Sequence, residues 1–253
     1  MNSEPPPNAA ATSADFEFEA LREAANYRTA LVHEFGEYLS GHVIEIGAGI
    51  GQMTAHLLDL PGIKRLIAIE PEAKLSSRHR EQFPGHELYE GTIDATPAGT
   101  AWDAILSINV LEHIEGDTRE LERYRALLSE RGGHFCVLVP ARPEIYAPID
   151  KDFGHFRRYT RPELRRKLEA AGFEIVRLHY FNFVGYFAWW LNFRVLGKRV
   201  FEVGKVRFYD RMIFPAVHFL ESTVARPPIG QSLVAVARAT LNSSDHHPTA
   251  RRT

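Results

Sequence analysis

The stretch Val43–Thr54, VIEIGAGIGQMT, decides the fold class of this chain. Its first four residues predict a short buried strand, its three glycines a tight turn, and its last residues the start of a helix. Because glycine has no Cβ and tolerates positive φ, such a turn lets backbone amides approach a nucleotide-like ligand. The following helix adds N–H groups and a partial positive charge at its start. The stretch therefore predicts a nucleoside-binding site in an α/β protein.

The spacing of these glycines argues against two other nucleotide sites. A dinucleotide fingerprint, G-x-G-x-x-G, needs its third glycine where this chain has Gln52, and the spacing here is G-x-G-x-G. No Gly-Lys-Ser or Gly-Lys-Thr follows, so the turn is not a P-loop. The carboxylate of Glu45, two residues before Gly47, would repel phosphates and favour an amino group. A nicotinamide dehydrogenase is therefore a weak alternative, which a response to NAD would revive.

A second carboxylate closes the next predicted strand, Arg65–Glu70. Glu70 lies 19 residues after Gly51, and a carboxylate at the end of this strand suits the two hydroxyls of a ribose. The E-x-G-x-G-x-G turn together with this acid resembles the class I S-adenosylmethionine-dependent methyltransferases. Within them, the chain is most similar to the small-molecule branch known as methyltransferase types 11 and 12.

The resemblance continues along about residues 20–180 in the order and spacing of that family. Gly91-Thr92-Ile93 falls where the family contacts adenine, Trp102–His113 resembles its fourth strand with an LEH ending, and Gly132–Pro140 resembles the fifth. It implies a Rossmann-like, doubly wound, seven-stranded α/β sheet in which strands 1–5 are parallel and the last strand is antiparallel. The remaining patterns predict an N-terminal helix over Phe16–Ser40, helices starting at the capping-box-like Asp117–Glu120 and at Thr160–Glu163, and strands over Phe173–Tyr180 and Ser232–Ala239.

About 50 residues, 181–231, separate the last two strands, far more than a hairpin loop. This insertion is rich in aromatic and basic residues, and we expect one or two helices with a turn at Gly204. Its apolar run is shorter than the roughly 20 residues that span a bilayer. A lid over an apolar substrate pocket, combined with core packing, is the first interpretation. A dimer interface and a patch that touches a membrane are the alternatives, the latter the least favoured.

Composition sets the remaining bounds. The chain has 253 residues and a net charge of −2, so no basic excess points to nucleic acid as a partner. The single cysteine, Cys136, excludes an internal disulfide and suits a reducing cytoplasm. Residues 1–15 contain no apolar run of a signal peptide, and we expect them and the tail 241–253 to be disordered. One methyltransferase domain over 16–240, as a monomer or homodimer in the cytoplasm, is the predicted organisation.

The resemblance implies a set of residues around S-adenosylmethionine. The turn would surround the methionine and ribose portion, Glu70 would accept from both ribose hydroxyls, and Thr92 and Ile93 would line the adenine. Asn109 would offer its carbonyl to the methionyl amine, and Tyr27 would either reach the cofactor or pack in its helix. The full predicted set is Tyr27, Glu45, Gly47, Ala48, Gly49, Gly51, Glu70, Pro71, Thr92, Ile93 and Asn109.

Two segments carry candidates for chemistry and substrate binding. His155, His113 and Tyr159 are candidate catalytic residues, because an imidazole can remove a proton from a hydroxyl or amine near neutral pH. Candidate substrate contacts come from the loop after the fifth strand and from the insertion: Tyr146, Arg157, Arg158, Tyr186, Trp189 and Trp190. The equally weighted alternative is an ordered loop in which His155 and the arginines pair with Asp150 or Asp152.

We expect no metal site. The Glu112-His113 pair is similar to a metal-binding segment of the ubiquinone-pathway O-methyltransferases, but these have a glutamate where this chain has Asn109. His113 is then expected to be a hydrogen-bonded residue behind the cofactor. The predicted function is transfer of a methyl group to an O or N atom, less readily C, of a small apolar or aromatic molecule. A lipid-linked, tRNA or protein substrate is the alternative, and a cofactor-binding subunit without turnover is the alternative of another class.

Overall fold

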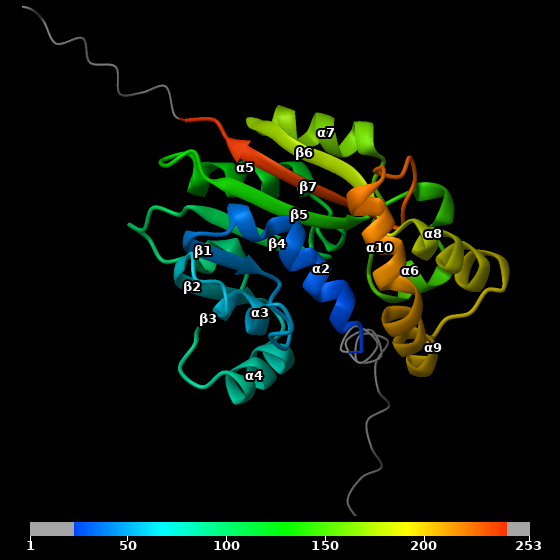
Figure 1. Cartoon of the computed structure of the whole chain (residues 1–253). Helices are drawn as coiled ribbons and strands as arrows, with labels where there is room; N and C mark the ends of the chain where they lie inside the picture. The colour runs from blue at the N-terminus through cyan, green and yellow to red at the C-terminus, as the bar shows by residue number, and fades with distance from the viewer. Residues whose placement is uncertain (1–22, 242–253) are drawn as a thin grey trace, which may run out of the picture.

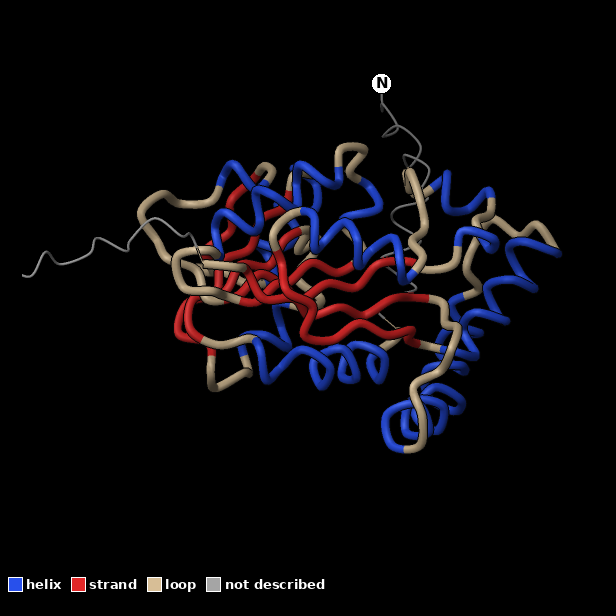
Figure 2. The backbone as a smooth tube through the Cα atoms, turned by 90° about the horizontal axis from the view of Figure 1, so that it is seen from above, coloured by secondary structure: helices blue, strands red, loops and turns tan. Residues whose placement is uncertain are grey.

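The computed structural model describes residues 23–241 and contains one seven-stranded sheet, with strand order β3-β2-β1-β4-β5-β7-β6 (Figures 1 and 2). The strands are β1 (Gly41–Ile46), β2 (Ile63–Glu70), β3 (Glu87–Glu90), β4 (Ala104–Ile108), β5 (His134–Pro140), β6 (Phe173–Phe181) and β7 (Ser232–Ala239). β1 to β5 pair in parallel, whereas β7 lies antiparallel to both β5 and β6. This arrangement confirms the predicted Rossmann-like fold, and β7 matches its predicted bounds.

Helices cover both faces of the sheet and bury an apolar core on each (Figure 2). One core gathers Trp102, Tyr124 and Phe135 beneath α5 (Asp117–Leu128) and α7 (Arg161–Ala170), and the other gathers Leu31 and Phe35 of α2 (Ala25–Phe35). Full burial of such side chains contributes about 1.5–3 kcal/mol each. The other helical segments are α3 (Thr54–Leu58), α4 (Ala73–Gln82), α6 (Pro148–Asp152) and 3₁₀ turns at Gly36–Tyr38, Ile93–Ala95, Leu111–His113 and Pro143–Ile145.

Of the helix predicted over Phe16–Ser40, the described residues contain α2, which runs from Ala25 to Phe35. Residues 16–22 lie outside the described residues, and α2 passes into the 3₁₀ turn Gly36–Tyr38. The helix has no capping side chain of its own. Instead, the carboxylate of Asp210 accepts hydrogen bonds from the backbone N–H groups of Asn26 and Tyr27, at 3.0 and 2.9 Å. A residue of the insertion therefore satisfies the free N–H groups at the start of this helix.

Both predicted helices begin near their predicted starts, but only one of them has the predicted side-chain cap. Thr160 caps α7 as expected, because its hydroxyl accepts the Glu163 N–H at 3.3 Å. At the start of α5, however, the residue before the helix is Gly116, and no side chain caps it. Asp117 is instead buried between α5 and α7, where its carboxylate forms an ion pair with Lys167 at 2.7 Å. The capping-box pattern at Asp117 thus marks a contact between two helices.

The insertion folds into two helical stretches that lie side by side at the end of the sheet where β6 ends and β7 begins (Figure 1). The first consists of α8 (Phe183–Trp189) and a π-helical segment, Trp190–Val195. The second consists of α9 (Val203–Phe208), a π-helical segment, Tyr209–Ile213, and α10 (Phe214–Thr223). The turn predicted at Gly204 was wrong: Gly204 lies inside α9, and the chain turns at Gly197, whose φ is +62°. Among the described residues, no helix has the length and apolar character needed to cross a membrane.

The acid stability of the fold is expected to depend on Glu34 of α2. Its buried carboxylate meets Arg226 at 2.7 Å and His179 at 3.4 Å. Burial opposes ionisation, but the hydrogen bonds and charges of His179 and Arg226 outweigh it and lower the pKa of Glu34 to about 2. This lowered pKa contributes up to about 3 kcal/mol of stability above pH 4.5, which is lost as the pH falls toward 2.

Urea unfolding between pH 7 and 3 tests this expectation. The free energy of unfolding should fall more steeply with acid in the wild type than in Glu34→Gln. Arg177 pairs with both Glu34, at 3.3 Å, and the exposed Glu37, at 2.6 Å, so Glu37→Gln is the matched control. Identical acid slopes for the wild type and Glu34→Gln would contradict the assignment.

Candidate active site

Two cavities lie at the carboxyl ends of the parallel strands and meet. The first, of about 680 Å³, is lined by the glycine turn and the ends of β2, β3 and β4, and we call it the turn cavity. The second, of about 420 Å³, lies between the strand ends and the insertion, and we call it the insertion cavity. Asn109 and Phe153 line both. Ligands of parallel α/β sheets bind at this edge, so the two cavities are the candidate active site.

The glycine turn has the geometry that its sequence predicts. Gly47 and Gly49 adopt φ values of +67° and +56°, in the left-handed region that favours glycine. A Cβ on Gly47 would lie 2.4 Å from a methyl group of Val110, so a side chain there would disturb the cavity wall. Gly51 differs, because a Cβ there would lie 2.2 Å from the Phe83 ring and Gly51 does not line the turn cavity. Its place in the turn is a packing requirement more than a ligand contact.

Two buried carboxylates flank this turn. Glu70 accepts the backbone N–H groups of Gly49 and Glu72, at 2.8 and 2.9 Å, and so ties the turn to the end of β2. Burial raises the pKa of Glu70, although these two hydrogen bonds act in the opposite direction. Burial also raises the pKa of Glu45 to about 8, against the effect of a 2.6 Å hydrogen bond from the Thr54 hydroxyl. A cation in the cavity would favour the ionised form of both side chains.

The rest of the turn cavity contains most of the other predicted cofactor residues. Pro71, Thr92, Ile93 and Asn109 line it together with Glu45, Gly47, Ala48, Gly49 and Glu70. Helix α3 has only five residues, so its dipole adds little at the turn. Tyr27 lines the insertion cavity instead, with its ring 5.4 Å from that of Phe181. Docking of α2 against the insertion accounts for this placement.

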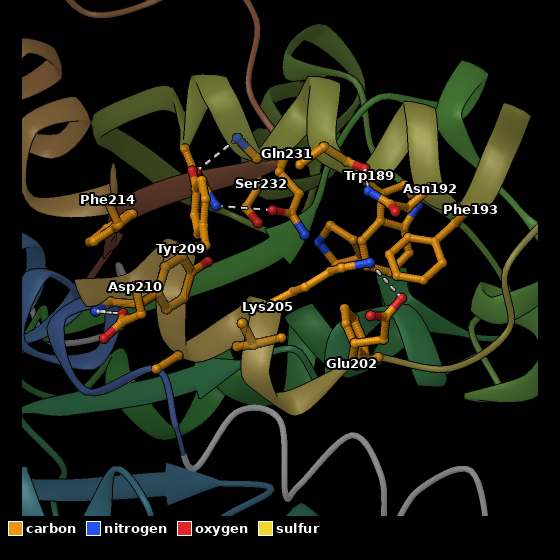
Figure 3. A pocket seen from close by; sticks show the side chains of 18 of the residues that line it. Trp189, Asn192, Phe193, Glu202, Lys205, Tyr209, Asp210, Phe214, Gln231 and Ser232 are labelled. Carbon is orange, nitrogen blue, oxygen red and sulfur yellow. Dashed lines mark hydrogen bonds and ion pairs between the residues drawn. The ribbon is translucent and has the colours of Figure 1, made fainter. Parts of the chain in front are cut away.

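The insertion cavity has apolar walls and a polar floor. Figure 3 shows Tyr209 and Phe214 on one side of it and Trp189 and Phe193 on the other. The polar groups that line it toward the sheet are Asn109, His155, Arg158, Asn182, Gln231 and Ser232. Asn182 begins α8, accepts the Gly185 N–H at 3.0 Å and donates to Gln231 at 2.9 Å. These bonds hold the start of the insertion against the segment that leads into β7.

His155 is held by a buried group of charges. Asp150 lies 3.1 Å from Nδ1 of His155 and accepts a 2.8 Å hydrogen bond from Arg158, whose guanidinium lies 4.3 Å from the centre of the Trp189 ring. His155 and Arg158 therefore pair with Asp150, as the structural alternative for this loop predicts. This pairing also has a chemical consequence: a hydrogen bond between Nδ1–H and Asp150 leaves Nε2 as the basic nitrogen of the ring. Nε2 of His155 is buried and makes no hydrogen bond among the described residues, although a carboxylate oxygen of Glu112 lies 3.9 Å from it.

His113 lies across from His155, with the two ring centres 4.7 Å apart. It faces the turn cavity, yet the surrounding protein desolvates its ring and lowers its pKa to about 4, with the charge of His155 acting in the same direction. Glu112, His113 and His155 each offer a ligand atom, all within 4.8 Å of one another. The expectation that no metal binds here stays a prediction.

Besides Gly51, five predicted catalytic and substrate residues lie outside the lining of both cavities. Arg157 donates to the Glu115 carbonyl and pairs with Asp117, and the Tyr146 hydroxyl donates to the His155 carbonyl at 2.7 Å. Both support the His155 loop from outside. On the insertion, the Tyr186 ring packs under Arg142, and Trp190 is 44% exposed. The fifth is Tyr159, which is fully buried, with its hydroxyl 2.9 Å from Asp117.

A conservative substitution tests the revised role of Tyr159. Tyr159→Phe is expected to leave turnover within about twofold of the wild type and to lower the free energy of unfolding by about 1–2 kcal/mol. The reason is that Asp117 keeps Lys167 and Arg157 but loses one buried hydrogen bond. Turnover and urea unfolding, measured on the same preparation, distinguish a structural role of Tyr159 from a catalytic one. A large loss of turnover at unchanged stability would restore the catalytic role.

The family-model comparison matches residues 19–178 to the methyltransferase domain. The chain belongs to this methyltransferase family. S-adenosylmethionine is accordingly its cofactor. The turn cavity fits it, because two buried carboxylates face the positive φ glycines and a cavity of about 680 Å³ is in the range of nucleotide-sized ligands. The comparison with curated proteins found no match.

Solved structures similar to this methyltransferase share its fold at low identity. The protein that forms a complex with the Trm112 methyltransferase activator in Haloferax volcanii is 16% identical, with a TM-score of 0.60 over 90% of this chain and 96% of that one. An S-adenosylmethionine-dependent methyltransferase from Mesorhizobium loti is 18% identical, with a TM-score of 0.58 over 86% and 99%. The [4+2]-cyclase SpnF is 20% identical, with a TM-score of 0.55 over 87% and 83%. The fold therefore accommodates different reactions, and the chemistry has to be argued from the site.

Sequence reasoning missed several residues of the insertion cavity. Asn182, Gln231 and Ser232 lie on its floor, and Phe153 lines both this cavity and the turn cavity. Asn182 and Ser232 adjoin the ends of β6 and β7, so the antiparallel pairing of those strands could have placed them together. Phe153 follows the short helix α6 and has no comparable signal in the sequence.

Proposed function

We propose that this methyltransferase transfers a methyl group from S-adenosylmethionine to an oxygen or nitrogen atom of a largely apolar molecule. The observation that supports this most is the junction of the two cavities at Asn109 and Phe153. A cofactor in one cavity and an acceptor in the other would meet there in line, as a displacement requires. Bound S-adenosylmethionine would supply an electrophilic methyl group on a positively charged sulfur.

His155 is the proposed base. With Asp150 on Nδ1, Nε2 would accept the proton of an acceptor hydroxyl or amine in the insertion cavity, and the Glu112 carboxylate, 3.9 Å from Nε2, would add to the stabilisation of the charged ring. Asp150 would then stabilise the resulting imidazolium, as Arg158 already stabilises Asp150. Asn109 fits the position where its carbonyl would hold the methionyl amine, because it directly follows β4 at the junction with a φ of +52°.

The composition of the insertion cavity supports an apolar acceptor with one polar end. Its walls include Trp189, Phe193, Phe201 and Phe214, and aromatic side chains offer large contact areas to apolar ligands. The polar floor groups lie next to the junction and would orient the reacting atom. A tRNA substrate is less well supported, because binding of its phosphates needs many cations. The described residues that line the insertion cavity are mostly apolar and include few cations.

A transfer assay tests this proposal. Protein would be incubated with methyl-labelled S-adenosylmethionine and separate aqueous and organic cell extracts, and the labelled product identified by mass spectrometry. We expect label in a product of the organic extract. Binding of S-adenosylmethionine without labelled product in any extract, including RNA and protein fractions, would instead favour a subunit without turnover.

A further inference from the structure

The exposed apolar side chains of this protein are concentrated on the insertion. Fifteen large apolar residues are exposed in the part of the chain that the structure describes, and eleven belong to residues 181–231. They are Phe187, Trp190, Leu191, Val195, Leu196, Val200, Phe208, Met212, Phe219, Leu220 and Val224. Such a concentration on one segment marks an interaction surface, whereas scattered apolar residues do not. We call these eleven residues the apolar surface.

Cations are interspersed with this surface. Residues 181–231 hold seven Lys and Arg against three Asp and Glu, whereas the rest of the sequence holds 23 against 29. Two of the three acids, Asp210 and Glu221, are buried in contacts with α2 and with the start of α8. Three of the seven cations, Arg199, Arg207 and Arg226, pair with acids outside the insertion. The excess positive charge therefore rests on Arg194 and Arg211, which are exposed. A positively charged apolar surface on an otherwise acidic protein is complementary to an anionic, partly apolar partner.

The insertion cavity opens within this surface. Val200 and Phe208 line the cavity, and they are also 55% and 61% exposed. Lys205 also lines the cavity and pairs with Glu202 at 2.7 Å (Figure 3). Lys198, another lining residue, pairs with the same carboxylate at 2.9 Å. An acceptor from the apolar surface would enter beside Val200 and Phe208 and pass the ion pairs of Glu202 with Lys198 and Lys205. Its polar end would lead toward His155, and its apolar part would remain at the rim.

We propose that the insertion docks on an anionic lipid bilayer and that the acceptor is an amphiphile taken from that bilayer. This rests on the proposed function and adds the source of the substrate. The two helical stretches would lie in the interface, with apolar side chains among the acyl chains and Arg194 and Arg211 at the head groups. A second copy of the chain fits less well, because a two-fold interface would set the excess positive charge of one insertion against that of the other.

Flotation with lipid vesicles tests the docking. Wild-type protein is expected to float with phosphatidylcholine vesicles that contain 30% phosphatidylglycerol, and to float much less with phosphatidylcholine alone or at high salt. Arg194→Ala with Arg211→Ala should weaken partitioning about 25-fold, since each basic residue near such a surface contributes about fivefold. Leu196→Glu with Met212→Glu should abolish it. Val176→Glu, which changes an exposed valine on β6, is the matched control and should float like the wild type.

Calorimetric binding of S-adenosylmethionine by each variant separates this proposal from the proposed function. Wild-type protein that binds the cofactor but does not float with anionic vesicles would overturn the docking and leave methyl transfer intact. A dimer in sedimentation velocity that Leu196→Glu with Met212→Glu dissociates, without vesicle binding by the wild type, would overturn it in favour of a second copy. Protein that floats but does not bind the cofactor would contradict the proposed function instead.

Discussion

Glu70→Ala is expected to weaken S-adenosylmethionine binding about 100-fold. Glu70 ends β2, lines the turn cavity and fixes the glycine turn through the Gly49 N–H. Its carboxylate keeps lone pairs for the two ribose hydroxyls after it has accepted the N–H groups of Gly49 and Glu72. Hydrogen bonds to a charged group contribute about 1.5–3 kcal/mol each, so the loss of two ribose contacts corresponds to about 3 kcal/mol or more.

The structure offers a matched control for this substitution. Glu90 is the register partner of Glu70 on β3, where it is exposed and pairs with Arg80. Glu90→Ala removes a carboxylate from the neighbouring strand end and should leave the dissociation constant unchanged. Titration calorimetry measures both variants, and thermal unfolding checks that each is folded. Equal affinities for Glu70→Ala and the wild type would show that Glu70 does not hold the ribose.

His155→Ala is expected to lower kcat about 1,000-fold while the dissociation constant of S-adenosylmethionine changes less than about twofold. The separation arises because His155 lines only the insertion cavity, and a positioned base contributes about 10²–10⁴-fold to turnover. His33→Ala, at an exposed position of α2, is the control. Small and equal effects on turnover and cofactor binding would reduce His155 to a structural partner of Asp150.

Local sequence patterns predicted the parts of the fold that depend on neighbouring residues. The glycine turn, the Thr160 cap and the alternation of strands and helices each follow from a few adjacent side chains. The patterns failed where a distant residue replaced a local one. Asp210 caps a helix whose first N–H groups lie 183 and 184 residues earlier in the chain, and Asp117 pairs with α7 instead of capping its own helix.

The candidate site shows the same division. The resemblance in sequence placed most of the turn cavity, because its residues follow directly after strands whose order is fixed. The side chains of the loop after β5 were harder to place from the sequence. The loop contains several acids, arginines and tyrosines, and no periodicity shows which of them point toward the cavities. Two buried acids divide these residues: His155 and Arg158 pair with Asp150, whereas Arg157 and Tyr159 bond to Asp117.

The most direct test of the account is a calorimetric titration of the wild-type protein with S-adenosylmethionine, with NAD as the competing ligand. The turn cavity, its two buried carboxylates and the G-x-G-x-G spacing predict one S-adenosylmethionine per chain with a dissociation constant of about 1–100 μM, in the usual range of enzyme substrates. They predict no heat from NAD. Binding of NAD, or no binding of S-adenosylmethionine by folded protein at about 1 mM, would contradict the assignment of the turn cavity.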